Sequence, residues 1–221
     1  PDGSLIWGRE YSVSGGLNFH DAISLSTGGS LVVGSSWSSN PTDSRMLMAK
    51  LREDGTAEWR LTPGRLSGSS LEAALEDENG DYLVAGSGLE TGSFQGYVAK
   101  VNSTGNLLWA QSLELPKGYN ISDLVKVKSN WYLLIGSIFN PAFNKEQLFL
   151  AYMDGNGQIL WSHVYGNFAN ADPLQAHKIA DNKILIAGAI EGILNKSRNI
   201  FTLQVDTMGV LSSGKIYGSH N

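Results

Sequence analysis

The sequence predicts an all-β fold, a β-propeller of four four-stranded antiparallel blades of about 50–52 residues with one extra N-terminal outer strand. The first observation is a glycine followed four residues later by tryptophan, which recurs at steps of 52, 50 and 52 residues. The second is an apolar run ending in glycine, and the third is an alanine in the next apolar run, both at the same spacing. Three markers in one phase indicate a tandem repeat whose sheets stack on one another to bury their faces.

Three positions therefore mark each copy of the repeat. The tryptophan marker occurs at Gly3/Trp7, Gly55/Trp59, Gly105/Trp109 and Gly157/Trp161, and a fifth copy begins at Gly209 with Ser213 in the tryptophan position. The apolar runs end at Gly34, Gly86, Gly136 and Gly188. The alanine occurs as Ala49, Ala99 and Ala151, with Leu203 in the fourth copy. The last repeat is thus the most degenerate one.

Each repeat is expected to form four short strands, because runs rich in β-branched, leucine and aromatic residues alternate with turn residues rather than helix caps. In the first repeat we expect strands at Ala22–Thr27, Ser30–Ser35, Met46–Leu51 and Thr56–Leu61. The first two strands of each repeat are joined by Gly28-Gly29, Asn79-Gly80, Ser129-Asn130 and Asp181-Asn182, residue types that tolerate the positive φ of a tight hairpin. No α-helix is expected.

The repeat phase places one domain over residues 1–221, with blades at about 19–62, 71–113, 121–165 and 174–218. Residues 4–11 are then a spare outer strand without inner partners of their own. Either four blades form a ring with an extra edge, or the chain is a segment of a larger parent ring. An exposed edge strand also invites pairing with a strand of another chain.

Composition excludes several classes of function. The net charge of −5 argues against a nucleic-acid partner bound through bulk electrostatics. The chain has no cysteine, which excludes disulfide scaffolds and cysteine-based zinc sites. No apolar run approaches the ~18 residues of a membrane-spanning helix, so no membrane insertion is expected. The absence of cysteine together with few lysines and many serines and asparagines favours an extracytoplasmic, secreted or cell-surface location.

The strings DAISLSTGGSLVVGSS and MLMAKLREDGTAEW resemble the tandem β-propeller repeats of secreted bacterial and archaeal proteins. AKVNSTGNLLW, residues 99–109, is similar to the tryptophan-docking motif of quinoprotein-type propellers. The resemblance covers nearly the whole chain and implies the propeller fold. It does not imply one activity, because such propellers include enzymes, lectins, scaffold lipoproteins and surface domains.

The recurring tryptophans are expected to dock one blade on the next. A large flat ring on the outer strand fills the space that widens between blades away from the axis, and its indole N–H then needs an acceptor. The residues assigned this structural role are Trp7, Trp59, Trp109 and Trp161.

A binding role is expected for the long loops between second and third strands and for the crossings between blades, because function concentrates in variable loops on rigid scaffolds. Aromatic side chains in these segments are candidate anchors for a protein or glycan partner, although single rings of this kind often fold back over blade edges. These residues are Phe19, Trp37, Phe94, Tyr119, Phe139, Phe143 and Phe168.

Polar residues are expected where the innermost strands begin, at the mouth of the central channel. They are His20, Asp21, Glu72, Asp123, Gln175 and His177. A ring of acids there would take a cation such as Ca²⁺ through oxygen ligands, whereas the simpler interpretation is that each carboxylate accepts backbone N–H bonds near its own turn. Asp77, Asn79 and Asp81 imitate the start of a calcium loop but lack its later glycine and glutamate, so we expect a hairpin turn there. Apart from Ca²⁺ at the channel mouth, we expect no metal or cofactor.

Taken together, the sequence favours a non-catalytic binding or scaffold propeller that contacts a protein or glycan partner through its long loops. A carbohydrate-binding, lectin-like propeller is one alternative. An enzyme with a channel-mouth site, completed by further blades or another domain, is the other. No residue is assigned a catalytic role, because nothing in the sequence marks a nucleophile.

Overall fold

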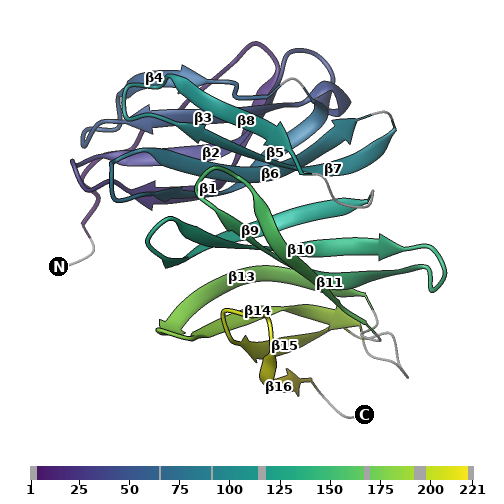
Figure 1. The fold of residues 1–221 in the computed structure, drawn as a ribbon. Coiled ribbons are helices and arrows are strands. Elements are labelled where there is room, and N and C mark those ends of the chain that lie inside the picture. Colours follow the sequence, from purple (N-terminus) through teal and green to yellow (C-terminus); the bar gives the residue numbers. More distant parts are fainter. Residues whose placement is uncertain are drawn as a thin grey trace. The chain divides into compact units, whose positions relative to one another are not determined.

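The computed structural model describes residues 4–64, 66–90, 92–113, 118–166, 170–191 and 198–218, which hold sixteen strands and one short 3-10 helix (Figure 1). Blade 1 consists of β1 (Gly16–Ser24), β2 (Ser30–Trp37), β3 (Arg45–Leu51) and β4 (Ala57–Leu61), with η1 (Pro41–Asp43) between β2 and β3. Blade 2 consists of β5 (Ser67–Glu76), β6 (Tyr82–Glu90), β7 (Ser93–Val101) and β8 (Leu107–Ser112). Blade 3 consists of β9 (Tyr119–Lys128), β10 (Trp131–Asn140), β11 (Lys145–Asp154) and β12 (Ile159–Tyr165). Blade 4 consists of β13 (Ala171–Ala180), β14 (Lys183–Glu191), β15 (Arg198–Val205) and β16 (Leu211–Tyr217).

Each blade is one sheet in which consecutive strands are neighbours, so the strand order within every sheet follows the chain. This confirms the prediction of four four-stranded antiparallel units. The extra N-terminal outer strand is wrong, because residues 4–11 have no strand hydrogen bonding. Blade 1 already has its own outer strand, β4, and residues 4–11 contact the blade through side chains instead. In the part of the chain that is described, no helix is long and apolar enough to cross a membrane.

The innermost strands begin earlier than expected, since β1 starts at Gly16 rather than at Ala22. Each of these strands carries a bulge, and the residue just before it pairs with the glycine that ends the apolar run, as in Phe19 with Gly34. A Cβ on Gly34 would lie 1.9 Å from the carbonyl oxygen of Asn18. The same clash, with the carbonyl sixteen residues earlier, recurs at Gly86, Gly136 and Gly188. The second marker of the repeat therefore records a close backbone approach at the bulge.

Gly136→Ala tests this packing requirement. The new Cβ would lie 2.0 Å from the Asn120 carbonyl oxygen and 3.0 Å from Ile121 Cα, so backbone must move. We expect a loss of about 3 kcal/mol in the free energy of unfolding, the upper part of the range for overpacking. Urea unfolding followed by far-UV circular dichroism measures it. Gly8→Ala is the control, because its Cβ meets only Leu5 at 4.0 Å and should change stability by less than about 0.5 kcal/mol.

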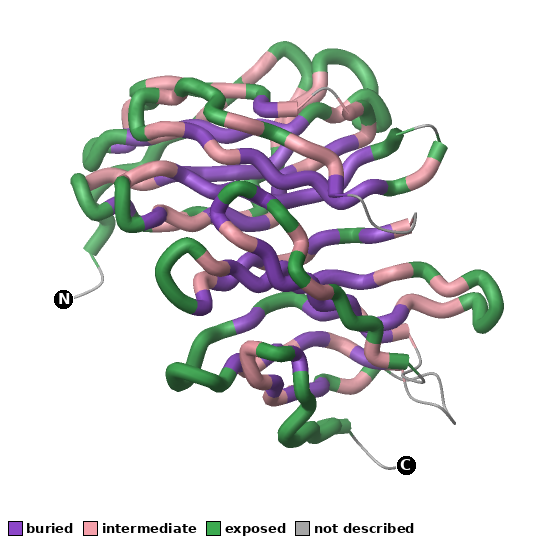
Figure 2. Tube along the Cα trace, in the orientation of Figure 1, coloured by how far each residue is buried: buried purple, intermediate pink, exposed green. Residues whose placement is uncertain are grey.

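The chain divides into two compact units. The first comprises Pro1–Gly92 and Val98–Gln111, and so holds blade 1 and most of blade 2. In it β5 packs on the strands of blade 1, and Leu31, Val33, Met46 and Met48 are fully buried. Figure 2 shows the buried residues along the middle of the strands and the exposed ones at the turns.

The second unit comprises Ser93–Tyr97 and Ser112–Asn221, and holds blades 3 and 4. One apolar cluster joins these two sheets, with Leu133, Ile135, Ile184 and Ile186 completely buried between them. Each buried side chain of this size contributes about 1.5–3 kcal/mol relative to leaving it in water. The hydrophobic core of each unit thus lies between blades, as stacked sheets require.

The turn at Asp77 joins β5 to β6, which confirms the hairpin expected from the sequence. The Asp77 carboxylate accepts the N–H groups of Asn79 at 2.8 Å and Asp81 at 3.0 Å. It also pairs with Lys100 of β7, with 2.8 Å between the two charged atoms, and its side chain is only 3% exposed. Asp81 lies 3.5 Å from the same ammonium. The turn is therefore held by a nearly buried ion pair.

Candidate functional site

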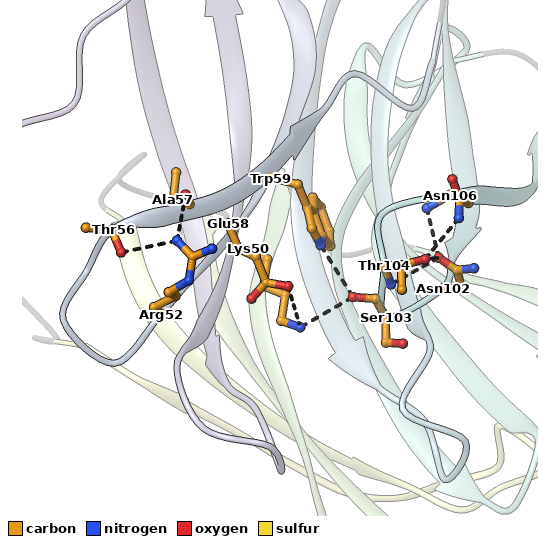
Figure 3. A network of polar contacts seen from close by, with 10 residues as sticks. All are labelled: Lys50, Arg52, Thr56, Ala57, Glu58, Trp59, Asn102, Ser103, Thr104 and Asn106. Atoms are coloured by element: carbon orange, nitrogen blue, oxygen red, sulfur yellow. Dashed lines mark hydrogen bonds and ion pairs between the residues drawn. The ribbon is translucent and has the colours of Figure 1, made fainter.

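Trp59 lies at the junction between blades 1 and 2 of the first unit (Figure 3). Its ring covers Gly105, where a Cβ would lie 2.9 Å from the indole, and its Nε1–H donates to the Ser103 carbonyl at 3.3 Å. Lys50 donates to the same carbonyl at 3.3 Å and pairs with Glu58 at 3.4 Å. Gly105 has a φ of 88°, which suits glycine and leaves a flat surface for the ring.

Trp161 makes the corresponding contact in the second unit. Its ring lies on Gly209, and it stacks on Tyr152 with the centroids 5.5 Å apart and an interplanar angle of 10°. Tyr165 of the same strand donates its hydroxyl to the Gly209 carbonyl. Burial raises the pKa of Tyr165 to about 12, so the hydroxyl stays protonated and can donate. The indole Nε1 of Trp161 is buried and has no hydrogen-bond partner in the described part of the chain.

Trp7 and Tyr11 repeat this arrangement on blade 1 although they belong to no sheet. A Cβ on Gly55 would lie 2.7 Å from the Trp7 ring, and Tyr11 donates its hydroxyl to the Gly55 carbonyl at 2.5 Å. Arg9 adds a bond from Nε to the Asp54 carbonyl at 2.6 Å. Residues 4–11 therefore dock on blade 1 in the same way as β12, the outer strand of blade 3, docks on blade 4. Trp109, the remaining marker, is half-buried in β8.

Two of the predicted channel-mouth acids link consecutive blades. Asp21 accepts the N–H of Ala22 at 2.7 Å and that of Ala74, on the next blade, at 3.0 Å. Asp123 does the same with Leu124 at 2.7 Å and with Ala176 at 2.6 Å. The simpler interpretation of the sequence is that each carboxylate accepts backbone N–H groups near its own turn only. Each one also accepts an N–H group of the next blade, and so joins its own inner strand to the following inner strand.

The expectation that these polar residues begin the inner strands is wrong, since they lie inside strands next to the bulges. Glu72 is itself the bulged residue of β5, so Ala73 and not Glu72 corresponds to Asp21. Glu72 takes the position of His20 of β1, and its carboxylate lies 3.1 Å from His20 Nδ1. Gln175 follows the bulge of β13 and is exposed, as is His177.

Calcium at the channel mouth stays a prediction. Among residues 4–218, as far as they are described, no group of three or more His, Cys, Asp or Glu side chains lies close enough to hold a metal ion. The oxygens of Asp21 and Asp123 already accept backbone N–H groups. These bonds give both carboxylates a structural role in joining blades.

The aromatic candidates of the second unit divide into exposed and buried rings. Phe94, Phe139 and Phe143 are 47%, 42% and 61% exposed. Gly118 connects the first two, because it donates to the Phe94 carbonyl at 3.0 Å and accepts the Phe139 N–H at 3.2 Å. Tyr119 is wrong as an exposed anchor, since it is 2% exposed and packs on Phe149 with the centroids 4.3 Å apart. Phe168 lies outside the described residues.

In the first unit Phe19 lies within β1 rather than in a loop, and it meets Tyr11 edge to face with the centroids 6.1 Å apart. Trp37 ends β2 and is half-buried. Its ring lies over Gly16, where a Cβ would be only 2.4 Å away. The glycine therefore lets the chain cross the face of the indole.

Trp37 borders an open depression of about 1070 Å³ in the first unit. The walls come from the segment before β1, the end of β2 with the following loop and the start of β3, and the end of β4. The lining residues are Ser12, Val13, Ser14, Ser36, Trp37, Ser38, Asp43, Arg45, Leu47, Arg60, Leu61 and Thr62. Five of the twelve carry hydroxyl groups, so the depression is mainly polar with one large aromatic ring.

The loop with Asp43, together with Arg45 at the start of β3, is fixed by blade 2. Ser69 of β5 donates its N–H to the Ser44 carbonyl at 3.1 Å, and its hydroxyl accepts the Met46 N–H at 3.2 Å. Asn40 also accepts the Thr42 N–H at 3.1 Å and so caps η1. The depression therefore has a preformed wall. Of its residues, the sequence singled out only Trp37, because the others are common polar and aliphatic residues with no distinctive spacing.

A scan against protein-family models found no match, and a search of curated proteins found no relative. The solved structures gave several similar chains. An exo-1,5-α-L-arabinanase from a bovine ruminal metagenomic library is 12% identical, with a TM-score of 0.51 over 93% of this chain and 77% of that enzyme. A puromycin hydrolase is 12% identical, with a TM-score of 0.49 over 91% of this chain, which spans only 29% of the hydrolase. At this identity the arabinanase match bears on the fold alone, and it agrees with the four antiparallel four-stranded sheets: the chain has a β-propeller fold.

Proposed function

We propose that the chain is a non-catalytic binding propeller and that the depression beside Trp37 binds an oligosaccharide. The observation that carries the proposal is the composition of the preformed walls, in which one indole stands among five hydroxyl groups and two arginines. An extracytoplasmic location, as the sequence predicts, suits such a ligand.

The chemistry of the walls matches that of a sugar. A pyranose ring presents an apolar C–H face that stacks on an aromatic ring, while its hydroxyl groups need hydrogen-bond partners around the rim. The Trp37 N–H and the Arg60 guanidinium make no hydrogen bond or ion pair within the described residues. Both donors are therefore available to ligand oxygens. A depression of this size accommodates a few sugar units rather than a single one.

A glycan array probed with the purified chain tests the proposal, and isothermal titration then gives the affinity for the best glycan. Trp37→Ala should weaken that affinity about tenfold, because it removes one stacking contact of about 1.4 kcal/mol. Adding Arg60→Ala to Trp37→Ala should weaken the affinity for that glycan further, because it removes a hydrogen-bond donor from the rim. Phe143→Ala, an exposed aromatic of the other unit, is the control and should bind like the wild type. Failure of every glycan to bind, or equal binding by Trp37→Ala, contradicts the proposal.

A protein partner is the second candidate, and the exposed phenylalanines Phe94, Phe139 and Phe143 favour it. Aromatic rings are enriched at the centres of protein interfaces, where they bury large area at low entropy cost. Replacing Phe143 by a photo-crosslinking amino acid should then give a covalent adduct with one extracellular protein. The same replacement of Trp37 should give no such adduct. Combined Phe94→Ala and Phe139→Ala substitutions must abolish that crosslink. A crosslink that survives them argues against this surface.

A further inference from the structure

The second unit contains an apolar cavity of about 460 Å³ between blades 3 and 4. It is lined by Leu148, Ala171, Ile190, Phe201, Leu203, Leu211, Gly214, Lys215 and Ile216. Of these described lining residues, Leu148 of β11 comes from blade 3 and the remainder from β13–β16 of blade 4. The cavity is distinct from the depression beside Trp37, which lies in the first unit.

The cavity arises where blade 4 departs from the repeat. In blades 1 and 3 an alanine of the third strand pairs with a residue that has a side chain, as in Ala49 with Arg60 and Ala151 with Ser162. In blade 4 Leu203 pairs with Gly214. A Cβ on Gly214 would lie 2.7 Å from Leu203 Cδ2, so the glycine makes room for the leucine. Leu203 thus takes the place of an outer-strand side chain, and the cavity lies beside these two residues.

The outer part of the cavity is apolar but not covered. Leu211 and Ile216 of the edge strand β16 are 45% and 59% exposed, although Ile216 pairs with the buried Phe201. Water in contact with such walls is unfavourable, and apolar cavities of this size take apolar ligands. An occupant with an apolar body would therefore be stabilised by covering these side chains.

The charge of one lining residue, Lys215, indicates the chemistry of the ligand's polar end. Among the described residues of the lining, Lys215 is the only charged one, and it forms no ion pair with any of the others that are described. Lys215 pairs with Thr202, so its side chain starts on the face opposite to Gly214 and Ile216. Because β16 is an edge strand, the long side chain can reach around the open edge to the mouth of the cavity. We propose that this cavity binds a medium-chain fatty acid, with the aliphatic chain between the blades and the carboxylate paired with Lys215.

Isothermal titration with decanoate and with decanol, both below the concentrations at which they self-associate, tests the proposal. The wild type should bind decanoate more tightly than decanol. Lys215→Ala should weaken decanoate binding at least fivefold and leave decanol unchanged, so that the preference disappears. Lys183→Ala, an exposed lysine of β14, is the matched control and should keep the preference.

Filling the cavity tests the apolar end. Gly214→Val should weaken the binding of both ligands, and Ile216→Ser serves if the valine variant does not fold, because Ile216 is exposed. Trp37→Ala should leave both affinities unchanged, which separates this site from the proposed saccharide site. The absence of decanoate binding, or binding that neither Lys215→Ala nor a cavity variant alters, overturns the inference.

Discussion

Trp161→Ala is expected to lower the free energy of unfolding by about 3 kcal/mol, within the range for truncating a large aromatic side chain. The ring lies between Tyr152 on its own sheet and Gly209 on the next, so its removal leaves a hole at the junction of two blades. Urea unfolding followed by far-UV circular dichroism measures the change without relying on the tryptophan that is removed.

Leu160→Ala is the matched control for this substitution. Leu160 is the preceding residue of β12 and about half exposed, so its truncation should cost less than about 1 kcal/mol. Equal stability of Trp161→Ala and the wild type would mean that the recurring tryptophans do not dock the blades.

Asp77→Asn is the second substitution with a large expected effect, about 3 kcal/mol. It leaves the Lys100 ammonium nearly buried, with only Asp81 at 3.5 Å as a partner, and breaking one side of a buried pair typically costs 3–5 kcal/mol. The double variant Asp77→Asn, Lys100→Met should be more stable than Asp77→Asn alone, because no unpaired charge remains. A double variant that is less stable by the full sum of the single effects contradicts the role of the pair.

The same pair predicts how stability depends on pH. Burial by itself would raise the pKa of Asp77, but Lys100 and the N–H groups of Asn79 and Asp81 outweigh it and hold the pKa below its usual value. Burial likewise opposes the charge of Lys100, but Asp77 and Asp81 outweigh it and raise the pKa of the ammonium. The Asp77 contribution is thus complete above about pH 4–5 and is lost as the pH falls through the folded-state pKa.

For Lys100 the direction is reversed. Its contribution is complete below the unfolded pKa of about 10.4 and is lost as the pH rises through the raised folded-state value. The stability difference between the wild type and Asp77→Asn should therefore be largest between about pH 5 and 9 and shrink on both sides. A difference that stays constant down to pH 2 would falsify the assignment.

The fold was predictable because the repeat markers have direct physical causes. Gly136 is required because the Asn120 carbonyl lies close to its Cα, and Gly105 because the Trp59 ring lies flat on it. Both glycines therefore recur at a fixed position of the repeat and can be recognised in the sequence. The sequence did not show in the same way that Glu72 corresponds to His20 rather than to Asp21. A bulge moves a side chain to the opposite face of a strand, and no residue type marks the exact position of these bulges.

The candidate site was predictable only in part, since Trp37 was visible as an aromatic residue near a loop. The serines and Arg60 around it gather there only because three separate segments meet, and that meeting depends on tertiary contacts such as the one from Ser69 to Ser44. The sequence also predicts an exposed loop position for Tyr119, which is buried. Strand β9 begins at this residue and turns the ring into the core.

The contacts between successive blades join residues at constant offsets along the chain. The Asp21 and Asp123 bonds each span 53 residues, and those of Tyr11, Trp59 and Tyr165 each span 44. Duplication or deletion of one whole repeat would leave every such offset intact, whereas a shift of a few residues within a repeat would break two junctions at once. The constant offsets make each repeat an exchangeable unit of the fold, and residues 4–11 show that a docking segment does not need a sheet of its own.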